Sequence, residues 1–313
     1  MAIFVGIDVS QEHLDVAVWE ERTTTRYANT VAGQQALCAV LTPRQPQLVV
    51  LEATGGMQDG CARILAAAGL PVAVVNPQMT HHFGRSCGQR AKTDAIDAQL
   101  LARYAAVVQP PARPLPAPHL VELDGLRARR RQLVEDLARD KTRLGQAIPL
   151  VRPSLERHID WLEQELRDVE QQLQQRIAAD EELSAVQDAL ETIPGIGVHT
   201  AQTLIAALPE LGTLSGKQIA ALAGLAPFAR ASGHWRGQQH CTGGRVAVKT
   251  ALYQAAVSAS RWHPRLAPWA QRLKDAGKGA KVRLVAVARR LLVIANAVVR
   301  DLLAARAAAA TAA

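Results

Sequence analysis

The chain has 313 residues, a formal net charge of +8 and a pI near 9.7. Hydrophobic residues make up 49% of it and aromatic residues only 4%, which excludes wholesale disorder and predicts cores built from aliphatic side chains. The length suggests two domains with a helical insert. The positive charge points to a polyanionic partner, for which nucleic acid is the usual candidate and an anionic membrane surface the weaker one.

Nothing in the sequence suggests secretion or membrane insertion. The four cysteines are Cys38, Cys61, Cys87 and Cys241. They show no CxxC spacing and no histidine cluster completes a zinc site, so we interpret them as reduced thiols. Asp8 interrupts the first apolar run, and the apolar stretch 291–299 is far shorter than the ~20 residues that span a bilayer. We therefore expect a soluble, cytoplasmic protein.

Strand and helix signals alternate over the first hundred residues. Apolar runs predict strands at 3–8, 14–19, 27–31, 48–52 and 72–75. Helical patterns predict helices at 34–41, 59–68 and 93–106, the last with Thr93 as its N-cap. This order predicts an α/β domain with a mixed sheet over residues 1–109.

A proline-rich linker and a helical hairpin are predicted next. Five prolines between residues 110 and 118 exclude regular structure and predict a linker over 110–119. Residues 120–182 carry apolar residues at three- and four-residue steps, interrupted by Pro149 and Pro153, with Ser154 as the cap of a second helix. The narrow apolar seam of this hairpin or coiled coil favours pairing with a second subunit, in a dimer or tetramer. An ordinary two-helix element within one chain is the alternative.

Residues 183–313 are predicted to form a mostly α-helical C-terminal domain. The segment Ile193-Pro194-Gly195-Ile196-Gly197 lies between two helical patterns, and Ser215 is expected to cap a helix that runs through Leu222. Residues 224–244 are Gly-rich and basic, which predicts an irregular stretch. Further helices are predicted at 245–260, 264–276 and 281–309.

Four acidic residues stand out by their positions in these elements. Asp8 and Glu52 end two predicted strands, and Asp94 and Asp97 lie three residues apart on one helix face. Converging carboxylates repel unless cations lie between them, and oxygen ligands suit Mg²⁺ or Mn²⁺. Two such ions can activate the attacking oxygen and stabilise the leaving oxygen at a phosphodiester. The simpler alternatives are a turn cap, an exposed strand end and a solvated first helical turn.

The segments around these acids resemble those of a known family. They are Gly6-Ile7-Asp8-Val9-Ser10, Leu51-Glu52-Ala53-Thr54-Gly55 and Lys92-Thr93-Asp94-Ala95-Ile96-Asp97-Ala98. They resemble the DEDD motifs of the RuvC-like, RNase H-fold domain of insertion-sequence transposases of family 110. The resemblance implies that fold and makes Asp8, Glu52, Asp94 and Asp97 the catalytic metal ligands. The nearby Asp15 and Asp59 are expected not to be ligands.

A second group of candidate residues surrounds a serine in the C-terminal half. A serine hydroxyl is a weak nucleophile that needs a base or nearby positive charge. The candidates to supply it, and to contact nucleic acid, are Arg230, His234, Arg236, Arg245 and Lys249. Residues 193–252 resemble the transposase domain of the same family, which implies that Ser232 attacks DNA covalently. Lys249 stands where arginine is more usual, which weakens it as a bidentate phosphate clamp. A loop serine that makes a local turn is the simpler interpretation.

Two further features suggest contacts with phosphate. The turn at Gly195 and Gly197 resembles a helix-hairpin-helix turn, whose backbone N–H groups can bind a DNA phosphate; a purely packing turn is the alternative. A late set of cations with few compensating acids is also a candidate for phosphate contact. It consists of Arg272, Lys274, Lys278, Lys281, Arg283, Arg289 and Arg290. Low aromatic content argues against base stacking as the main means of recognition.

The sequence therefore predicts a transposase or site-specific recombinase. It would cleave and rejoin DNA through a covalent Ser232–DNA intermediate, with Mg²⁺ or Mn²⁺ held by the four carboxylates. The family resemblance implies a structured guide RNA, encoded by the element, that pairs with donor and target DNA. A metal-dependent DNA junction resolvase or nuclease that uses water, and a non-catalytic nucleic-acid-binding protein, are the two alternatives.

Overall fold

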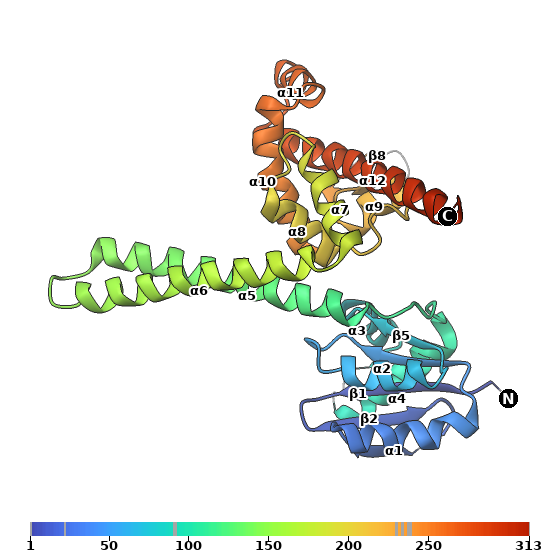
Figure 1. The fold of residues 1–313 in the computed structure, drawn as a ribbon. Coiled ribbons are helices and arrows are strands. Elements are labelled where there is room, and N and C mark those ends of the chain that lie inside the picture. Colours follow the sequence, from blue (N-terminus) through green and yellow to red (C-terminus); the bar gives the residue numbers. More distant parts are fainter. Residues whose placement is uncertain are drawn as a thin grey trace. The chain divides into compact units, whose positions relative to one another are not determined.

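The computed structural model describes residues 2–21, 23–89, 93–228, 231–232, 235–236 and 240–312, and of residues 231–232 and 235–236 it describes the backbone. The chain divides into two compact units (Figure 1). Unit 1 is Met1–Leu115 and unit 2 is Pro116–Ala313. The helical hairpin therefore belongs to the same compact unit as the C-terminal helices.

Unit 1 is built around a five-stranded sheet in the order β3-β2-β1-β4-β5. Its strands are β1 (Phe4–Val9), β2 (His13–Val18), β3 (Thr24–Ala28), β4 (Leu48–Glu52) and β5 (Val72–Val75). The pairs β1–β2 and β2–β3 are antiparallel, whereas β1–β4 and β4–β5 are parallel. The predicted mixed α/β sheet is confirmed. The prediction of a strand through Val31 was wrong, because Thr30 caps a helix that begins at Val31 and accepts a hydrogen bond from the Gly33 N–H.

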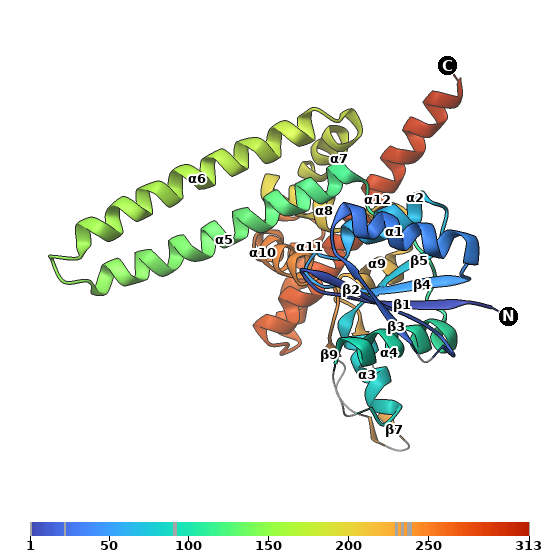
Figure 2. The same ribbon diagram turned by 90° about the horizontal axis from the view of Figure 1, so that it is seen from below.

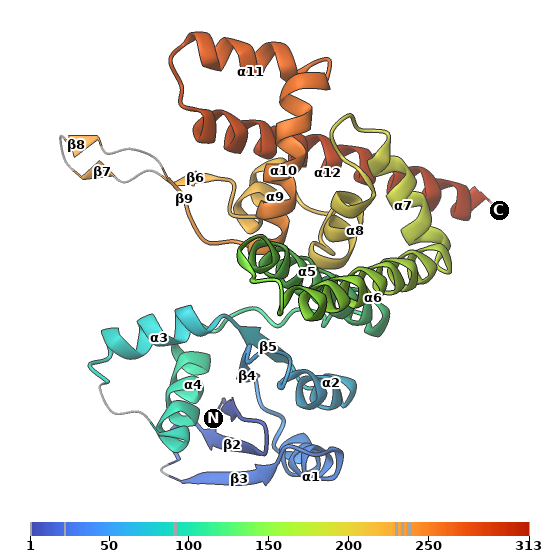
Figure 3. The same ribbon diagram turned by 90° about the vertical axis from the view of Figure 1, so that its left-hand side faces the viewer.

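Helices cover both faces of this sheet (Figure 3). One face packs against α1 (Val31–Leu41) and α2 (Asp59–Ala67), and the other against α3 (Pro77–Ser86) and α4 (Asp94–Val108). A short 3-10 helix (Thr42–Arg44) follows α1. Because side chains alternate along a strand, odd-numbered residues of β1 join the core with α1 and α2, and Phe4 joins the core with α4.

Helix α3 was not predicted, whereas α4 lies where a helix was predicted. Asn76-Pro77, interpreted as the end of a strand, also begins α3, because the Asn76 side chain accepts from the Gln78 N–H and Pro77 suits the first helical turn. The predicted N-cap at Thr93 is confirmed, since its hydroxyl accepts from the Ile96 N–H.

Unit 2 begins with the predicted antiparallel hairpin, formed by α5 (Pro118–Gln146) and α6 (Arg152–Ala178) (Figure 2). Leu133, Leu162 and Val169 are buried between the two helices. Two boundary predictions were wrong. Pro118 begins α5, so the last residues assigned to the linker are helical, and α6 begins at Arg152 instead of being capped by Ser154. Proline at the first positions of a helix loses no hydrogen bond, which explains both differences.

The remaining helices pack around one core. They are α7 (Glu181–Glu191), α8 (Val198–Ala207), α9 (Gly216–Leu222), α10 (Val246–Trp262), α11 (Leu266–Asp275) and α12 (Ala280–Ala312). The base of the hairpin belongs to this core, since Leu123, Leu173 and Ile177 are buried with it. The capping role of Ser215 is confirmed by a capping box with Gln218. Among the described helices, none combines the length and apolarity needed to cross a membrane.

Short strands replace part of the stretch that was predicted to be irregular. Pro227–Phe228 (β6) pairs with His240–Cys241 (β9), and Ala231–Ser232 (β7) pairs with Trp235–Arg236 (β8). Each of these strands is two residues long, which is too short for the alternation of apolar and polar residues that predicts a strand.

Candidate active site

The carboxyl ends of β1 and β4 bring two of the predicted carboxylates together. Ile7 of β1 is paired in parallel register with Leu51 of β4, so Asp8 and Glu52 are the next residues of neighbouring strands. Such strands lie about 4.8 Å apart. Both acids share the sheet face of Phe4, which α4 covers, and both are partly exposed to solvent.

Gly6 allows α4 to lie directly against β1. A Cβ atom at residue 6 would meet the backbone nitrogen of Ala102 at 2.1 Å, so only glycine fits. Asp94 and Asp97 lie in the first turn of the same helix, before this contact. The close approach therefore brings the helix carboxylates to the face that carries Asp8.

The electrostatics of Asp8 place the other carboxylates near enough to repel it. The pKa of Asp8 is raised from 3.8 to about 6, first because burial disfavours the charged form. Repulsion from Asp97, Asp94, Glu52 and Asp15 raises this pKa further, in that order. A set of mutually repelling carboxylates, with oxygen donors only, matches the ligand preference of Mg²⁺ and Mn²⁺.

Two side chains that the sequence analysis did not single out hold these carboxylates. The hydroxyl of Thr80, which is 2% exposed, donates a hydrogen bond to Oε2 of Glu52 at 2.7 Å. Arg26 donates to both oxygens of Asp15 at 3.0 Å and to Asp94 at 3.2 Å. Thr80 lies on the helix that was missed, and Arg26 lies in a strand with no motif around it, so neither carried a sequence signal.

The four predicted ligands thus converge without forming a ligand shell. Within the described ranges, no group of three or more His, Cys, Asp or Glu side chains is gathered closely enough to hold a metal ion. The ion pair with Arg26 holds Asp94 toward Asp15, which is one physical reason. Asp15 itself is buried and paired, consistent with its expected absence from the ligand set.

Three glycines close the base of the segment that carries Ser232. A Cβ at Gly224 would meet the Gly243 carbonyl oxygen at 2.0 Å, and one at Gly244 would meet the Gly224 nitrogen at 2.1 Å. All three glycines have positive φ, a conformation that other residues rarely adopt. Beyond this contact, Ser232 pairs through its backbone with Trp235. The structure therefore assigns the backbone of Ser232 to a short antiparallel strand pair.

The basic residues proposed to assist the serine have different surroundings. Arg245 donates to both carboxylate oxygens of Glu210 and to the carbonyl oxygen of Ala207, so its guanidinium is already engaged. Lys249 donates to the Gly243 carbonyl oxygen at 3.1 Å, beside the glycine contact. Three candidates remain predictions. Arg230 and His234 lie outside the described residues, and Arg236 is described by its backbone alone.

The other candidate phosphate contacts are spread over unit 2. Gly195 packs against α10, because a Cβ there would meet Cβ of Ala259 at 2.7 Å, which assigns it a packing role. Gly197 precedes α8 with open space beside it, and its phosphate contact stays a prediction. Lys281 lines a large pocket, whereas Arg283 is not among the residues that line it.

Comparison with known proteins places both halves of the chain in one family. Residues 5–153 match a model for the DEDD transposase domain of IS110 elements, described as a transposase, and residues 187–270 match the model described as the transposase IS116/IS110/IS902 family. The chain belongs to the IS110 family of transposases. It is also 29% identical over 311 residues to the pilin gene-inverting protein of Moraxella bovis. The alignment covers 95% of this chain and 96% of that protein.

The pilin gene-inverting protein of Moraxella lacunata shows the same identity and coverage.

Membership of the IS110 family confirms the RNase H-like fold of the N-terminal domain and the prediction of a transposase or recombinase enzyme. The DEDD domain of this family implies a divalent metal ion, and the transposase family implies DNA binding.

Proposed function

We propose that this IS110-family enzyme transposes or inverts a DNA segment through a serine-linked intermediate. The observation that carries the proposal is the placement of Asp8 and Glu52 at neighbouring strand ends, with Asp94 and Asp97 on the helix that packs against them. Burial raises the pKa of Asp8 to about 6, and repulsion from these acids adds to the rise. Bringing four mutually repelling carboxylates together without a cation costs stability, and such an arrangement is typical of a cation-binding site.

Asp8, Glu52, Asp94 and Asp97 would hold the divalent metal ion. When bound, the ion would lower the charge on the phosphodiester and stabilise a developing oxyanion. The residues of the chain position the ligands: Thr80 orients Glu52 through its hydrogen bond, and Arg26 holds Asp94 until that carboxylate turns toward the other three. Hydrogen bonds of this kind orient ligands at metal sites and tune their affinity.

Ser232 would act as the nucleophile. Its Oγ attacks a DNA phosphorus atom, the bond from phosphorus to one deoxyribose oxygen breaks, and the DNA phosphate becomes esterified to the serine. The hydroxyl proton leaves to a general base, and the departing deoxyribose oxygen takes up a proton. Attack by the free hydroxyl of another strand on the phosphoserine ester then rejoins DNA and restores the serine hydroxyl.

The proposed partners are donor DNA, target DNA, a structured guide RNA and further copies of this chain. The net charge of +8 and the low aromatic content support recognition of nucleic acid backbones with base pairing supplied by a guide. Exposed apolar residues at and near the turn of the hairpin support its role in a dimer or tetramer. They are Ile148, Leu150, Val151 and Trp161, with Leu150 87% exposed.

Covalent trapping tests the proposal. Wild-type protein incubated with Mg²⁺, element-end DNA and the element's RNA is expected to form a denaturant-resistant protein–DNA adduct, whereas Ser232→Ala forms none. Ser260→Ala is a matched control, because the Ser260 hydroxyl bonds to the Val257 carbonyl within α10. An adduct that persists in Ser232→Ala rules out this serine as the nucleophile. Mg²⁺-dependent cleavage without any adduct assigns instead a water-using resolvase or nuclease.

A further inference from the structure

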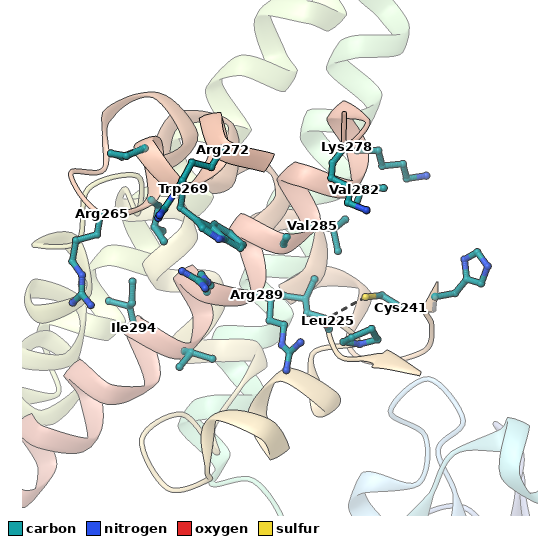
Figure 4. Close-up of a pocket in the computed structure, with 18 of the residues that line it drawn as sticks. Leu225, Cys241, Arg265, Trp269, Arg272, Lys278, Val282, Val285, Arg289 and Ile294 are labelled. Carbon is teal, nitrogen blue, oxygen red and sulfur yellow. Dashed lines mark hydrogen bonds between the residues drawn. The ribbon is translucent and has the colours of Figure 1, made fainter. Parts of the chain in front are cut away.

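Unit 2 contains a large pocket whose described lining residues include six cations and no acid. It lies between the segment that leads into α11, α11 itself and the first half of α12, with the β6–β9 pair at one end (Figure 4). Its volume is about 1520 Å³. The cations that line it are Arg265, Arg272, Lys278, Lys281, Arg289 and Arg290. We call this cavity the basic pocket.

The positive charge of the basic pocket is not compensated. No ion pair joins any of its six cations to an Asp or Glu in the part of the chain that the structure describes. The hairpin differs, since several of its cations pair with neighbouring acids, as Arg130 does with Glu170 and Lys141 with Glu163. Repelling cations that share one cavity without acids favour a polyanionic ligand.

The walls of the basic pocket suit a nucleic acid strand with accessible bases. Apolar side chains, among them Val282, Val285 and Ile294, lie between the cations. The guanidinium of Arg290 stacks over the Trp269 ring, 3.8 Å from its centroid. An arginine plane held by an aromatic ring can stack on a base through its other face. In a duplex the faces of the bases are stacked inside, so only sugars and phosphates could contact these walls. A single strand has both phosphates for the cations and accessible base faces for the apolar side chains and Arg290.

The length of the cationic row fits several nucleotides. Lys281 and Arg289 lie on the pocket face of α12, and a rise of about 1.5 Å per residue separates them by about 12 Å along the helix. A stacked strand carries one phosphate per about 3.4 Å, so this span covers about three or four phosphates.

We propose that the basic pocket binds a single-stranded segment of nucleic acid, with phosphates on its cations and a base on the Arg290 plane. The inference deepens the proposed function, because strand exchange exposes such segments in DNA and a guide exposes them in RNA. DNA and RNA share the recognised chemistry, so the experiment separates them as two ligands.

The test measures binding by full-length protein that carries Ser232→Ala, in EDTA. Labelled oligo(dT), oligo(rU) and duplex DNA are titrated by fluorescence anisotropy over a range of salt concentrations. A pocket variant combines Arg272→Gln, Lys278→Gln and Arg289→Gln. A matched control combines Arg129→Gln, Arg157→Gln and Lys217→Gln, which removes the same charge from exposed positions of unit 2 outside the pocket.

The pocket variant should bind oligo(dT), oligo(rU) or both at least about tenfold more weakly than the control variant. When the logarithm of the binding constant is plotted against the logarithm of the salt concentration, its slope should be smaller in magnitude by about 2. Whichever strand loses affinity identifies the ligand. Equal affinity of pocket and control variants, or a loss confined to the duplex, overturns the inference. Because no cleavage takes place in EDTA, this binding result does not depend on whether Ser232 is the nucleophile. Covalent trapping on Ser232 likewise does not depend on whether the basic pocket prefers a single strand.

The stacking role of Arg290 has its own variant. Arg290→Lys keeps the charge and removes the plane, so the affinity for the bound strand should fall at least about fivefold while the salt slope stays the same. An affinity equal to that of the parent protein overturns the contact between a base and Arg290. Unchanged thermal unfolding of the variants shows that lost binding is not lost folding.

Discussion

The carboxylate face of unit 1, formed by Asp8, Glu52, Asp94 and Asp97, and the basic pocket of unit 2 carry charge of opposite sign. On the carboxylate face, burial raises the pKa of Asp8 to about 6, and repulsion from the neighbouring acids adds to this rise. In the basic pocket, six cations from neighbouring helical segments line one cavity without an acid. The first arrangement favours cations and the second favours polyanions. The comparison teaches that each unit carries its own candidate site, one suited to a cation and the other to a polyanion.

The two regions also differ in how they are built. The carboxylates occupy fixed positions of a sheet and a helix that Gly6 brings into backbone contact. The pocket cations are long side chains on helix surfaces, and most of them are exposed. We therefore expect the carboxylate face to be sensitive to small changes in packing and the pocket to respond mainly to changes in charge.

The largest effect is expected from Gly6→Ala. Its Cβ would lie 2.1 Å from a backbone nitrogen of α4, so the helix must move away from β1. We expect a loss of about 3 kcal/mol or more in the free energy of unfolding, measured in urea, together with loss of DNA cleavage. Gly125→Ala is the control: no atom lies within 4 Å of its Cβ, and α5 should gain about 0.5–1 kcal/mol. A Gly6→Ala protein as stable as wild type would show that the close approach is not required.

The next effect concerns the hydrogen bond between Thr80 and Glu52. Thr80→Val keeps the shape of the side chain and removes the donor, so Mn²⁺ affinity measured by calorimetry should fall about 10–100-fold. Thr142→Val in α5 removes a hydroxyl that bonds only within its helix, and it should leave this affinity unchanged. Equal affinities in the two variants would mean that Thr80 does not orient Glu52.

The smallest effect is a pH-dependent change in stability without metal. The folded pKa of Asp8, about 6, lies above its ordinary value of 3.8, so this group makes the folded state less stable as pH rises through that window. Asp8→Asn should therefore be more stable than wild type by about 1–2 kcal/mol at pH 8 and equal to it at pH 3.5, by urea unfolding in EDTA. The reverse order at pH 8 would show that burial and the neighbouring acids do not raise the pKa of Asp8.

The carboxylate face could be predicted because its geometry follows from local patterns. Asp8 and Glu52 end parallel strands whose apolar runs are visible in the sequence, and Thr93 marks the start of the helix that carries Asp94 and Asp97. Strand ends meet at one sheet edge, so position in the chain was enough to bring these residues together.

The features that sequence analysis missed depend on tertiary packing. Thr80 and Arg26 reach the carboxylates from other elements, at separations of 28 and 68 residues from Glu52 and Asp94. The hydrogen bonds from Arg245 to Glu210 likewise connect residues that are 35 positions apart in the chain. No periodic pattern in the sequence predicts this contact. The cations of α11 and α12 were visible as a set, but only packing divides them, placing Lys281 in the pocket and leaving Arg283 outside it.

Mn²⁺ binding by single carboxylate variants tests the central claim most directly. Full-length wild type, Asp8→Asn and Asp59→Asn would be titrated with Mn²⁺ and followed by electron paramagnetic resonance. Asp59, which accepts a hydrogen bond from its neighbour Gln58, is the matched acid that should not be a ligand. We expect wild type and Asp59→Asn to bind Mn²⁺ equally, and Asp8→Asn to bind at least about 100-fold more weakly. Undiminished binding by Asp8→Asn would contradict the assignment of the carboxylate face as the metal site.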